Sequence, residues 1–402
     1  MAATLHIGRC VVLGVLLLLT LLFDSPSLAQ SSDEATIRKI AESYFAAYAR
    51  EDLDALTHMW SVKSPDLARA KARLNEFFSL NDQIETRNLI LSRFNIEGDH
   101  ASALAQVEVI AVDVKTGKTS AGSGKMNRAI SFAREASQWK VWRDVPAEED
   151  LASALVAAKT DGERSAILEK EKDLQTAELW KSLIAQGEKL SLTGDYPRAL
   201  GAYALAKTIA EQIGDKTGIA RALDLTGVVL ARQGSYGLSL DLLHQSLALG
   251  ESLGDKTLVA APTYHIGVVH YLQSDYELAL EYYTKTLALG EATGSKLDIA
   301  ASLTGIGIIH YRHGRYDLAL DYYHRALLLR EELGSSLGIA YALGNIGIVY
   351  HVLGNYSLAL EYHQKDLALL ESLGAKPDAI TTLHNIGLIY ESQGNYRLAL
   401  EY

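Results

Sequence analysis

Residues 306–345 read IGIIHYRHGRYDLALDYYHRALLLREELGSSLGIAYALGN, and this stretch decides the fold of the C-terminal half of the chain. Apolar and aromatic residues recur in it at helical spacing, at Ile306, Ile309, His310, Leu318, Tyr322 and Leu329. Gly314 and Gly334 end the two segments, because a glycine takes up a left-handed conformation without steric cost. The stretch therefore predicts two antiparallel helices joined by a tight turn.

The same pattern recurs every forty residues without an insertion. The repeated glycines are Gly187, Gly227, Gly267, Gly307, Gly347 and Gly387, and the repeated tyrosines are Tyr196, Tyr236, Tyr276, Tyr316, Tyr356 and Tyr396. One helical hairpin cannot bury its apolar face alone, so neighbouring copies must stack. We therefore expect residues 183–402 to form an all-α superhelical solenoid of antiparallel helix pairs, six copies in all, with the last one truncated.

Four residues of the unit connect it with a known family. Gly307, Tyr316, Ala319 and Tyr323 match the glycine, tyrosine, alanine and aromatic positions of the tetratricopeptide repeat. The chain resembles the forty-residue variant of this repeat, although Leu243 replaces the aromatic residue in one copy and Ser274 replaces a turn glycine in another. The resemblance implies that the first helices line a concave wall that binds a peptide or partner protein.

The resemblance also implies which residues form that wall. They are Tyr264, Tyr271, Thr304, Tyr311, Arg312, Tyr341, His351, His384 and Glu391. Asn345 and Asn385 lie two residues before the repeat glycine, where an Asn of a peptide-binding member bonds to the ligand backbone. An equally good interpretation is that each Asn ties one helix to the next. The wall has no cationic clamp for a C-terminal carboxylate, so we expect a ligand of mixed apolar and polar groups.

Residues 30–146 lack the forty-residue pattern and combine helix-like with strand-like segments. A helical stripe follows a cap at Asp33, and further helices are expected over 52–60 and 66–80. Strand-like segments then follow at 85–94, 101–114, 125–134 and 138–144. Helices first and an antiparallel meander last predict a small α+β, cone-like domain.

Two segments of this domain carry a second resemblance. YFAAYAREDLDALTHMW (44–60) and WKVWRDV (139–145) are similar to the SnoaL-like, nuclear-transport-factor-like family. The resemblance implies a cone that serves either as an enzyme pocket or as a recognition surface. Asp54 and His58, four residues apart on one helix, are the best acid–base pair available. The alternative for this pair is a solvent-exposed helix face, and catalysis is the lesser hypothesis.

Residues 147–182 are charged and favour helices. We expect a helical hairpin with a turn at 160–162 that caps the N-terminal end of the solenoid. The residues expected to pack inward are Leu151, Leu155, Ile167 and Trp180.

Residues 1–29 have the features of a signal peptide. His6 and Arg9 precede an apolar run over 11–23, and small residues follow near 27–29. We expect export to the periplasm or the outside of the cell; the alternative is an uncleaved membrane anchor. Cys10 is the only cysteine and leaves with the signal, so the mature chain is expected to lack disulfides.

The composition narrows the range of ligands. The formal net charge is −11, which disfavours nucleic acid because such a partner is usually met by a basic face. No cofactor motif and no metal-ligand spacing appears. His270 and His310 take the places of Tyr350 and Tyr390 in later copies, so we interpret them as packing residues and not as metal ligands.

These observations predict a non-catalytic, exported scaffold that binds a protein or peptide, with no cofactor and no membrane contact after signal cleavage. Because the sixth copy stops at Tyr402, a fragment is expected. Exported bacterial proteins with this repeat resemble, further along the chain, caspase-like CHAT proteases. The alternative function is therefore the sensory or substrate-recruiting front of a longer protease or signalling protein. The second alternative is a small-molecule isomerase or hydrolase activity of the cone.

Overall fold

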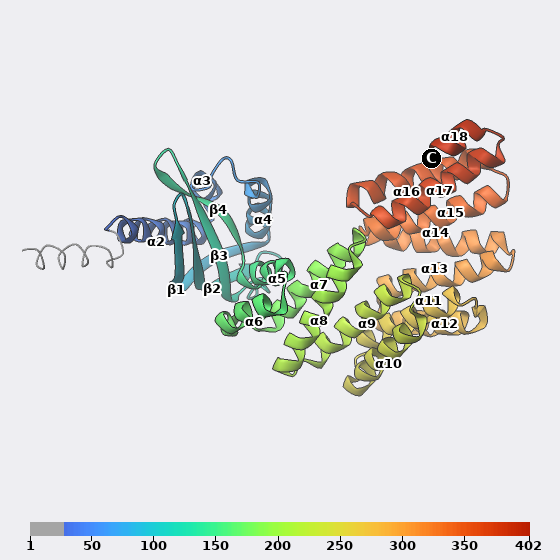
Figure 1. Ribbon diagram of the computed structural model, residues 1–402, viewed down its shortest axis with the longest axis horizontal. Coiled ribbons are helices and arrows are strands. Elements are labelled where there is room, and N and C mark those ends of the chain that lie inside the picture. Colours follow the sequence, from blue (N-terminus) through green and yellow to red (C-terminus); the bar gives the residue numbers. More distant parts are fainter. Residues whose placement is uncertain (1–27) are drawn as a thin grey trace, which may run out of the picture. The chain divides into compact units, whose positions relative to one another are not determined.

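The computed structural model describes residues 28–402, and the chain divides into two compact units, one ending at Asp150 and one from Leu151 to Tyr402. Figure 1 shows the sheet of the first unit and the paired helices of the second. Residues 1–27 of the predicted signal peptide 1–29, including Cys10, lie outside the described residues. Within residues 28–402, no helix has both the length and the apolar character needed to cross a bilayer.

The N-terminal unit has three helices followed by a four-stranded sheet. Its elements are α2 (Leu28–Ala49), α3 (Leu53–His58), α4 (Leu67–Leu80), β1 (Asn81–Glu97), β2 (His100–Asp113), β3 (Gly124–Glu135) and β4 (Gln138–Pro146). Each strand pairs antiparallel with the next one in the sequence, in the order β1-β2-β3-β4. The predicted α+β order, with helices first and a meander last, is confirmed.

The core of this unit lies between α2 and one face of the sheet. Alternate residues of β2 are buried, at Ala101, Ala103, Ala105, Val107, Val109 and Ala111. The alanines are small enough to accept the large side chains of α2, including Ile37, Tyr44 and Phe45, in one cluster.

The predicted cap at Asp33 is wrong, because α2 begins upstream at Leu28. The Asp33 carboxylate instead faces the sheet. It accepts a hydrogen bond of 3.0 Å from Trp139 Nε1 and pairs with Arg134. The bond from Trp139 lowers the pKa of this carboxyl group. Asp33 therefore fastens the helix to the third and fourth strands and does not start the helix.

A polar network is buried beside the same core. The Asp144 carboxylate accepts hydrogen bonds from Arg128 Nε at 2.8 Å and from Tyr44 Oη at 3.0 Å. Arg73 donates to the Asp144 backbone carbonyl at 2.8 Å. Arg128 is 8% and Asp144 is 6% exposed, so each charge depends on the other for compensation.

Substitution of Asp144 by Asn should therefore destabilise the N-terminal unit by about 3 kcal/mol, because it leaves the Arg128 charge buried without a counter-charge. Three of the four tryptophans, Trp60, Trp139 and Trp142, lie in this unit, so tryptophan fluorescence during denaturant unfolding measures the loss. The exposed Asp54→Asn is the control and should change the midpoint little. Equal midpoints for the two variants would contradict the importance of the buried pair.

The second unit begins with two short helices and continues as helix pairs. After α5 (Ala147–Ala157), α6 (Asp161–Lys170) and the 3₁₀ helix η1 (Lys172–Leu174), the first helices of the pairs are α7 (Ala177–Leu192), α9 (Lys216–Arg232), α11 (Lys256–Leu272), α13 (Lys296–Arg312), α15 (Ser336–Val352) and α17 (Lys376–Ser392). The second helices are α8 (Tyr196–Ile213), α10 (Tyr236–Leu253), α12 (Tyr276–Thr293), α14 (Tyr316–Glu332), α16 (Tyr356–Leu373) and α18 (Tyr396–Glu401). The predicted solenoid of paired helices is confirmed.

Each pair closes by a large residue packing on a small one. A Cβ atom placed on Gly307 would lie 2.7 Å from the Tyr323 ring, and one on Gly267 would lie 2.9 Å from the Tyr283 ring. Tyr323 is 2% exposed, so the ring fills the space that the missing side chain leaves. Leu318, expected in the apolar stripe, is instead 47% exposed, because the face of α14 that packs inward carries Ala319 and Tyr323.

The turns between the paired helices behave as the repeat predicts. Gly314 has a φ of +73° at the end of α13. Ser274 takes a φ of +65° at the equivalent place, so the copy without glycine keeps the same left-handed turn. The predicted departure at Ser274 thus leaves the helix pair intact.

Two helices, α5 and α6, precede the repeats. Thr160 and Glu163 make a capping box at the start of α6, as the predicted turn requires. Leu151, Leu155 and Trp180 are buried as predicted, whereas Ile167 is only partly buried. Gln186 Nε2 donates to Ser153 Oγ at 3.1 Å, which joins α5 to α7.

Helix α16 departs from its neighbours by burying two polar side chains. His363 takes the place of the buried tyrosine and is 0% exposed, with both ring nitrogens unpartnered among the described residues. Asp366 is 4% exposed and accepts a hydrogen bond from Thr382 Oγ1 at 2.7 Å. Burial lowers the pKa of His363 to about 4 and raises the pKa of Asp366 to about 6.

A carboxyl group whose pKa is raised by folding stabilises the fold only while it is protonated, so the contribution of Asp366 is lost as pH rises through about 6. Asp366→Asn keeps this site neutral. It should raise the free energy of unfolding by about 2 kcal/mol at pH 8, with the gain shrinking as pH falls toward 4. Denaturant unfolding followed by circular dichroism at both pH values measures it. The control is Asp317→Asn on the exposed face of α14, and a gain independent of pH would contradict the assignment to ionisation.

Candidate functional site

Residues of several repeats, from both first and second helices, line one cavity of about 600 Å³. Residues of α9 and α11 line one side of it, and residues of α15 and α17 line the other. Its aromatic lining consists of Tyr196, Tyr236, Tyr264 and Tyr341. Because helices more than one hundred residues apart in the sequence share this lining, the solenoid curves around the cavity and makes it an inner channel.

A polar cluster joins the two sides of the channel. Arg232, the last residue of α9, lies near Tyr196 and Tyr341, and interactions of its side chain with both tyrosines raise its pKa. Tyr341 Oη in turn donates to Asp378 Oδ2 at 3.3 Å. Desolvation lowers the pKa of Arg232, but Tyr341 and Asp378 outweigh it, so the net pKa is raised. The second repeat is thereby connected directly to the fifth and sixth.

An apolar contact accompanies this cluster. A Cβ atom placed on Gly194, in the turn of the first repeat, would lie 3.2 Å from Pro377 Cγ at the start of α17. Gly194 has a φ of +84°, so both its conformation and the closeness of Pro377 favour glycine there. The two ends of the described solenoid therefore touch beside the channel.

A second, smaller cavity of about 300 Å³ lies along α7, α9 and α11. Its charged lining consists of Glu188, Arg221, Asp224 and Asp255. His265 lines this cavity and also the channel. Its Nδ1 atom lies 2.7 Å from Oδ1 of Asp224, which is 7% exposed.

The repeat has a clear family match. The family model described as "Tetratricopeptide repeat" matches residues 225–292, 258–332, 298–372 and 338–402. This part of the chain consists of tetratricopeptide repeats.

Several solved structures are similar to the chain. BtubC (BKLC) from P. vanneervenii is 17% identical, with 50% of this chain and 85% of that one covered at a TM-score of 0.41. Aspartyl phosphate phosphatase F from Bacillus subtilis is 18% identical, with 60% and 72% covered at a TM-score of 0.42. A Rap protein complexed with Competence and Sporulation Factor is 18% identical, with 59% and 77% covered at a TM-score of 0.46. No curated protein matches the chain.

Two of the predicted wall residues face the channel of the tetratricopeptide repeats. Tyr341 lines it through the polar cluster described above. Tyr264 also lines it, and its ring packs against the buried Tyr283 ring with centroids 5.4 Å apart. Burial raises the pKa of both Tyr264 and Tyr341. Tyr264 therefore belongs both to the channel and to the core.

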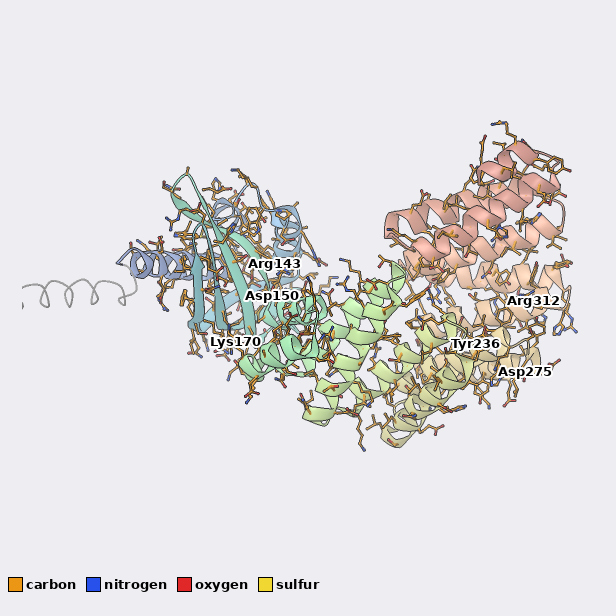
Figure 2. The ribbon with its side chains drawn as sticks, viewed as in Figure 1. Arg143, Asp150, Lys170, Tyr236, Asp275 and Arg312 are labelled. Atoms are coloured by element: carbon orange, nitrogen blue, oxygen red, sulfur yellow. The ribbon has the colours of Figure 1, made fainter. Side chains whose placement is uncertain are left out.

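Other predicted wall residues contact the neighbouring repeat and line neither cavity. Arg312, the last residue of α13 (Figure 2), donates to Tyr271 Oη at 2.7 Å. His351 Nε2 lies 2.9 Å from Ser392 Oγ. Both contacts span 41 residues, so they link equivalent ends of consecutive first helices. Tyr311 packs near Tyr316 of its own repeat, with ring centroids 5.8 Å apart.

The remaining predicted residues are spread over other surfaces. His384 and Glu391 line a cavity of about 430 Å³ beside α18. Thr304 Oγ1 donates to the Ala300 carbonyl of its own helix at 2.9 Å. Asn345 and Asn385 are partly buried, and neither side chain bonds to another residue of the described chain. The amides of these two residues thus make no tie between helices.

Sequence reasoning missed His265 and Arg232. His265 lies two residues before Gly267, at the same repeat position as Asn345 and Asn385, and Arg232 has the repeat position of Arg312. The forty-residue register could have identified both. The Asp224–His265 contact was harder to find, because no pattern in a single repeat reveals a pairing between two of them.

Asp54 and His58 form the solvent-exposed helix face that the sequence favours, and the lesser hypothesis of an acid–base pair does not hold. His58 Nδ1 lies 2.7 Å from the backbone carbonyl oxygen of Asp54, and both side chains are exposed on α3. The four-residue spacing brings the ring to the helix backbone, so the carboxylate is left in solvent.

His270 and His310 are packing residues, as predicted. Their rings stack on Tyr282 and Tyr322 with centroids 5.6 and 5.3 Å apart, and Tyr350 stacks on Tyr362 in the same way at 5.5 Å. Over residues 28–402, no group of three His, Cys, Asp or Glu side chains is placed to hold a metal ion.

Replacing Arg232 by Met should loosen the contact across the channel, because Met has a side chain of similar size but no charge to interact with Tyr341 and Asp378. Amides in α15 and α17 should exchange with deuterium about fivefold faster, the effect of losing roughly 1 kcal/mol of local stabilisation. Peptide-resolved hydrogen exchange measures this. The control is Arg325→Met on α14, outside both cavities, and equal exchange in the two variants would show that the cluster does not hold the repeats together.

Proposed function

We propose that this chain is a non-catalytic binding protein whose tetratricopeptide repeats hold an extended peptide, or an extended segment of a partner protein, in the inner channel. The observation that carries the proposal is the aromatic lining of the 600 Å³ cavity by four tyrosines from separate repeats. Tyrosine offers a large apolar surface with few rotatable bonds and a hydroxyl group for a polar contact.

The size and chemistry of the channel support this proposal. Its volume is within the range of about 300–1,000 Å³ that is typical of ligand sites. Val228 and Leu272 add apolar surface, whereas Arg232 and Asp378 add charges of opposite sign. Such a lining suits a ligand that alternates apolar side chains with polar backbone groups, which an extended peptide does.

For the N-terminal unit we propose a SnoaL-like recognition domain without catalysis. The order of its helices and strands and the exposure of Asp54 and His58 support this assignment. We also propose export of the chain, on the strength of the charged and apolar pattern of residues 1–29.

Filling the channel should abolish peptide binding. Val228→Trp places an indole in the cavity from the partly buried face of α9. Wild-type protein, used to select from a random-sequence short-peptide library, should enrich related sequences. The best of these should bind the variant at least tenfold more weakly by fluorescence anisotropy, a loss of about 1.4 kcal/mol or more.

The matched control is Leu238→Trp on α10, where the leucine is 62% exposed and outside both cavities. It adds the same ring to the surface and should leave binding unchanged, with circular dichroism confirming equal helix content. Failure of the wild type to enrich any sequence, or equal binding by the Val228→Trp variant, would sink the proposal.

A further inference from the structure

His265 lies at the junction of the two cavities. Its side chain is 25% exposed, and it lines both the 300 Å³ cavity and the 600 Å³ channel. One ring nitrogen, Nδ1, is occupied by the contact of 2.7 Å with Asp224. Nε2 has no hydrogen bond to another of the described residues, and it is the polar atom of this ring that a ligand can reach.

Asp224 determines which chemistry the free nitrogen offers. An ionised carboxylate only accepts hydrogen bonds, so the neutral ring must carry its proton on Nδ1. Nε2 then presents a lone pair. The ring therefore selects a ligand group that donates a hydrogen bond, in contrast with an asparagine side chain, which both donates and accepts.

His265 occupies a repeat position that two other copies fill with asparagine. His265, Asn345 and Asn385 each lie two residues before the repeat glycine, on α11, α15 and α17. Gly305 occupies the position between the first two, where a Cβ atom would lie 2.7 Å from the Tyr283 ring. Gly305 interrupts the series of polar side chains, and of these positions only His265 lines the channel.

We propose that His265 Nε2 accepts a hydrogen bond from a main-chain N–H of the bound peptide, and that Asp224 is the positioning residue that keeps the proton on Nδ1. This inference rests on the proposed function. The third repeat then supplies a contact to the backbone of the peptide and not to one of its side chains. The inference also explains why the buried carboxylate of Asp224, which is 7% exposed, lies against a ring that lines both cavities.

The test uses a peptide selected by the wild-type protein and a series of analogues in which one backbone amide at a time is replaced by an ester. Each ester removes a single N–H donor. One analogue should bind wild-type protein five- to tenfold more weakly, as expected for a lost hydrogen bond. The same analogue should bind His265→Ala no more weakly than the parent peptide does, because the acceptor is already absent.

Two further variants separate positioning from a simple structural role. In Asp224→Ala the ring can move its proton to Nε2, so the sensitivity to that ester should disappear. If Asp224 only ties α9 to α11, its loss lowers the unfolding midpoint but leaves the sensitivity intact, and the inference is overturned. His244→Ala, on the exposed face of α10, is the control and should keep the full sensitivity.

The remaining outcomes are also decisive. A wild-type protein that binds the peptide in its channel, as judged by Val228→Trp, but tolerates every ester would overturn the role of His265 while the peptide-binding function stands. The same holds if His265→Ala shows the full ester loss. Absence of any selected peptide would overturn both proposals together.

Discussion

The packing of a buried aromatic ring against a glycine is the contact on which the solenoid depends. Tyr323 on Gly307 and Tyr283 on Gly267 let the two helices of a pair approach closely, because the ring occupies the volume that a side chain would need. The glycine recurs every forty residues, and Leu243 and His363 take the place of the tyrosine in two copies, so these pairs keep the same close approach. Identical pairs stacked in identical register accumulate a constant rotation, and this rotation curves the first helices around a common channel.

The residues that line the channel differ between copies of the repeat, although the helix pairs that carry them are alike. The glycine of each helix pair is constant from copy to copy, whereas the position two residues before it holds His265 in one copy, Gly305 in the next, and Asn345 and Asn385 in two others. His265 and Arg232 show what such differences do. Each sits on a scaffold fixed by its neighbours, and each makes a contact that its equivalents elsewhere in the chain do not make. Recognition can therefore vary while the fold stays constant.

The local structure was predictable from the sequence, and the closure of the superhelix was not. Gly314, Ser274 and the forty-residue period fixed helix ends and turns, since these depend on contacts within one repeat. The strands of the N-terminal unit could also be predicted, because apolar and polar residues alternate along them. The contact of Arg232 with Tyr341 escaped prediction, because it depends on a rotation summed over several repeats. The cap at Asp33 failed for a related reason, because a cap pattern describes a helix in isolation, whereas the neighbouring sheet offers this carboxylate Trp139 and Arg134 as partners.

The bridge from Arg232 to Tyr341 and Asp378 also changes how the molecule would respond to force and to a guest. In most repeat proteins each repeat contacts only its neighbours. Here the second repeat also contacts the fifth and sixth, so extending the solenoid first requires breaking the contact of Arg232 with Tyr341 and Asp378. For the peptide binding that we propose, this contact predicts slow association and slow dissociation, because the ligand would have to thread along the axis or wait for the contact to open.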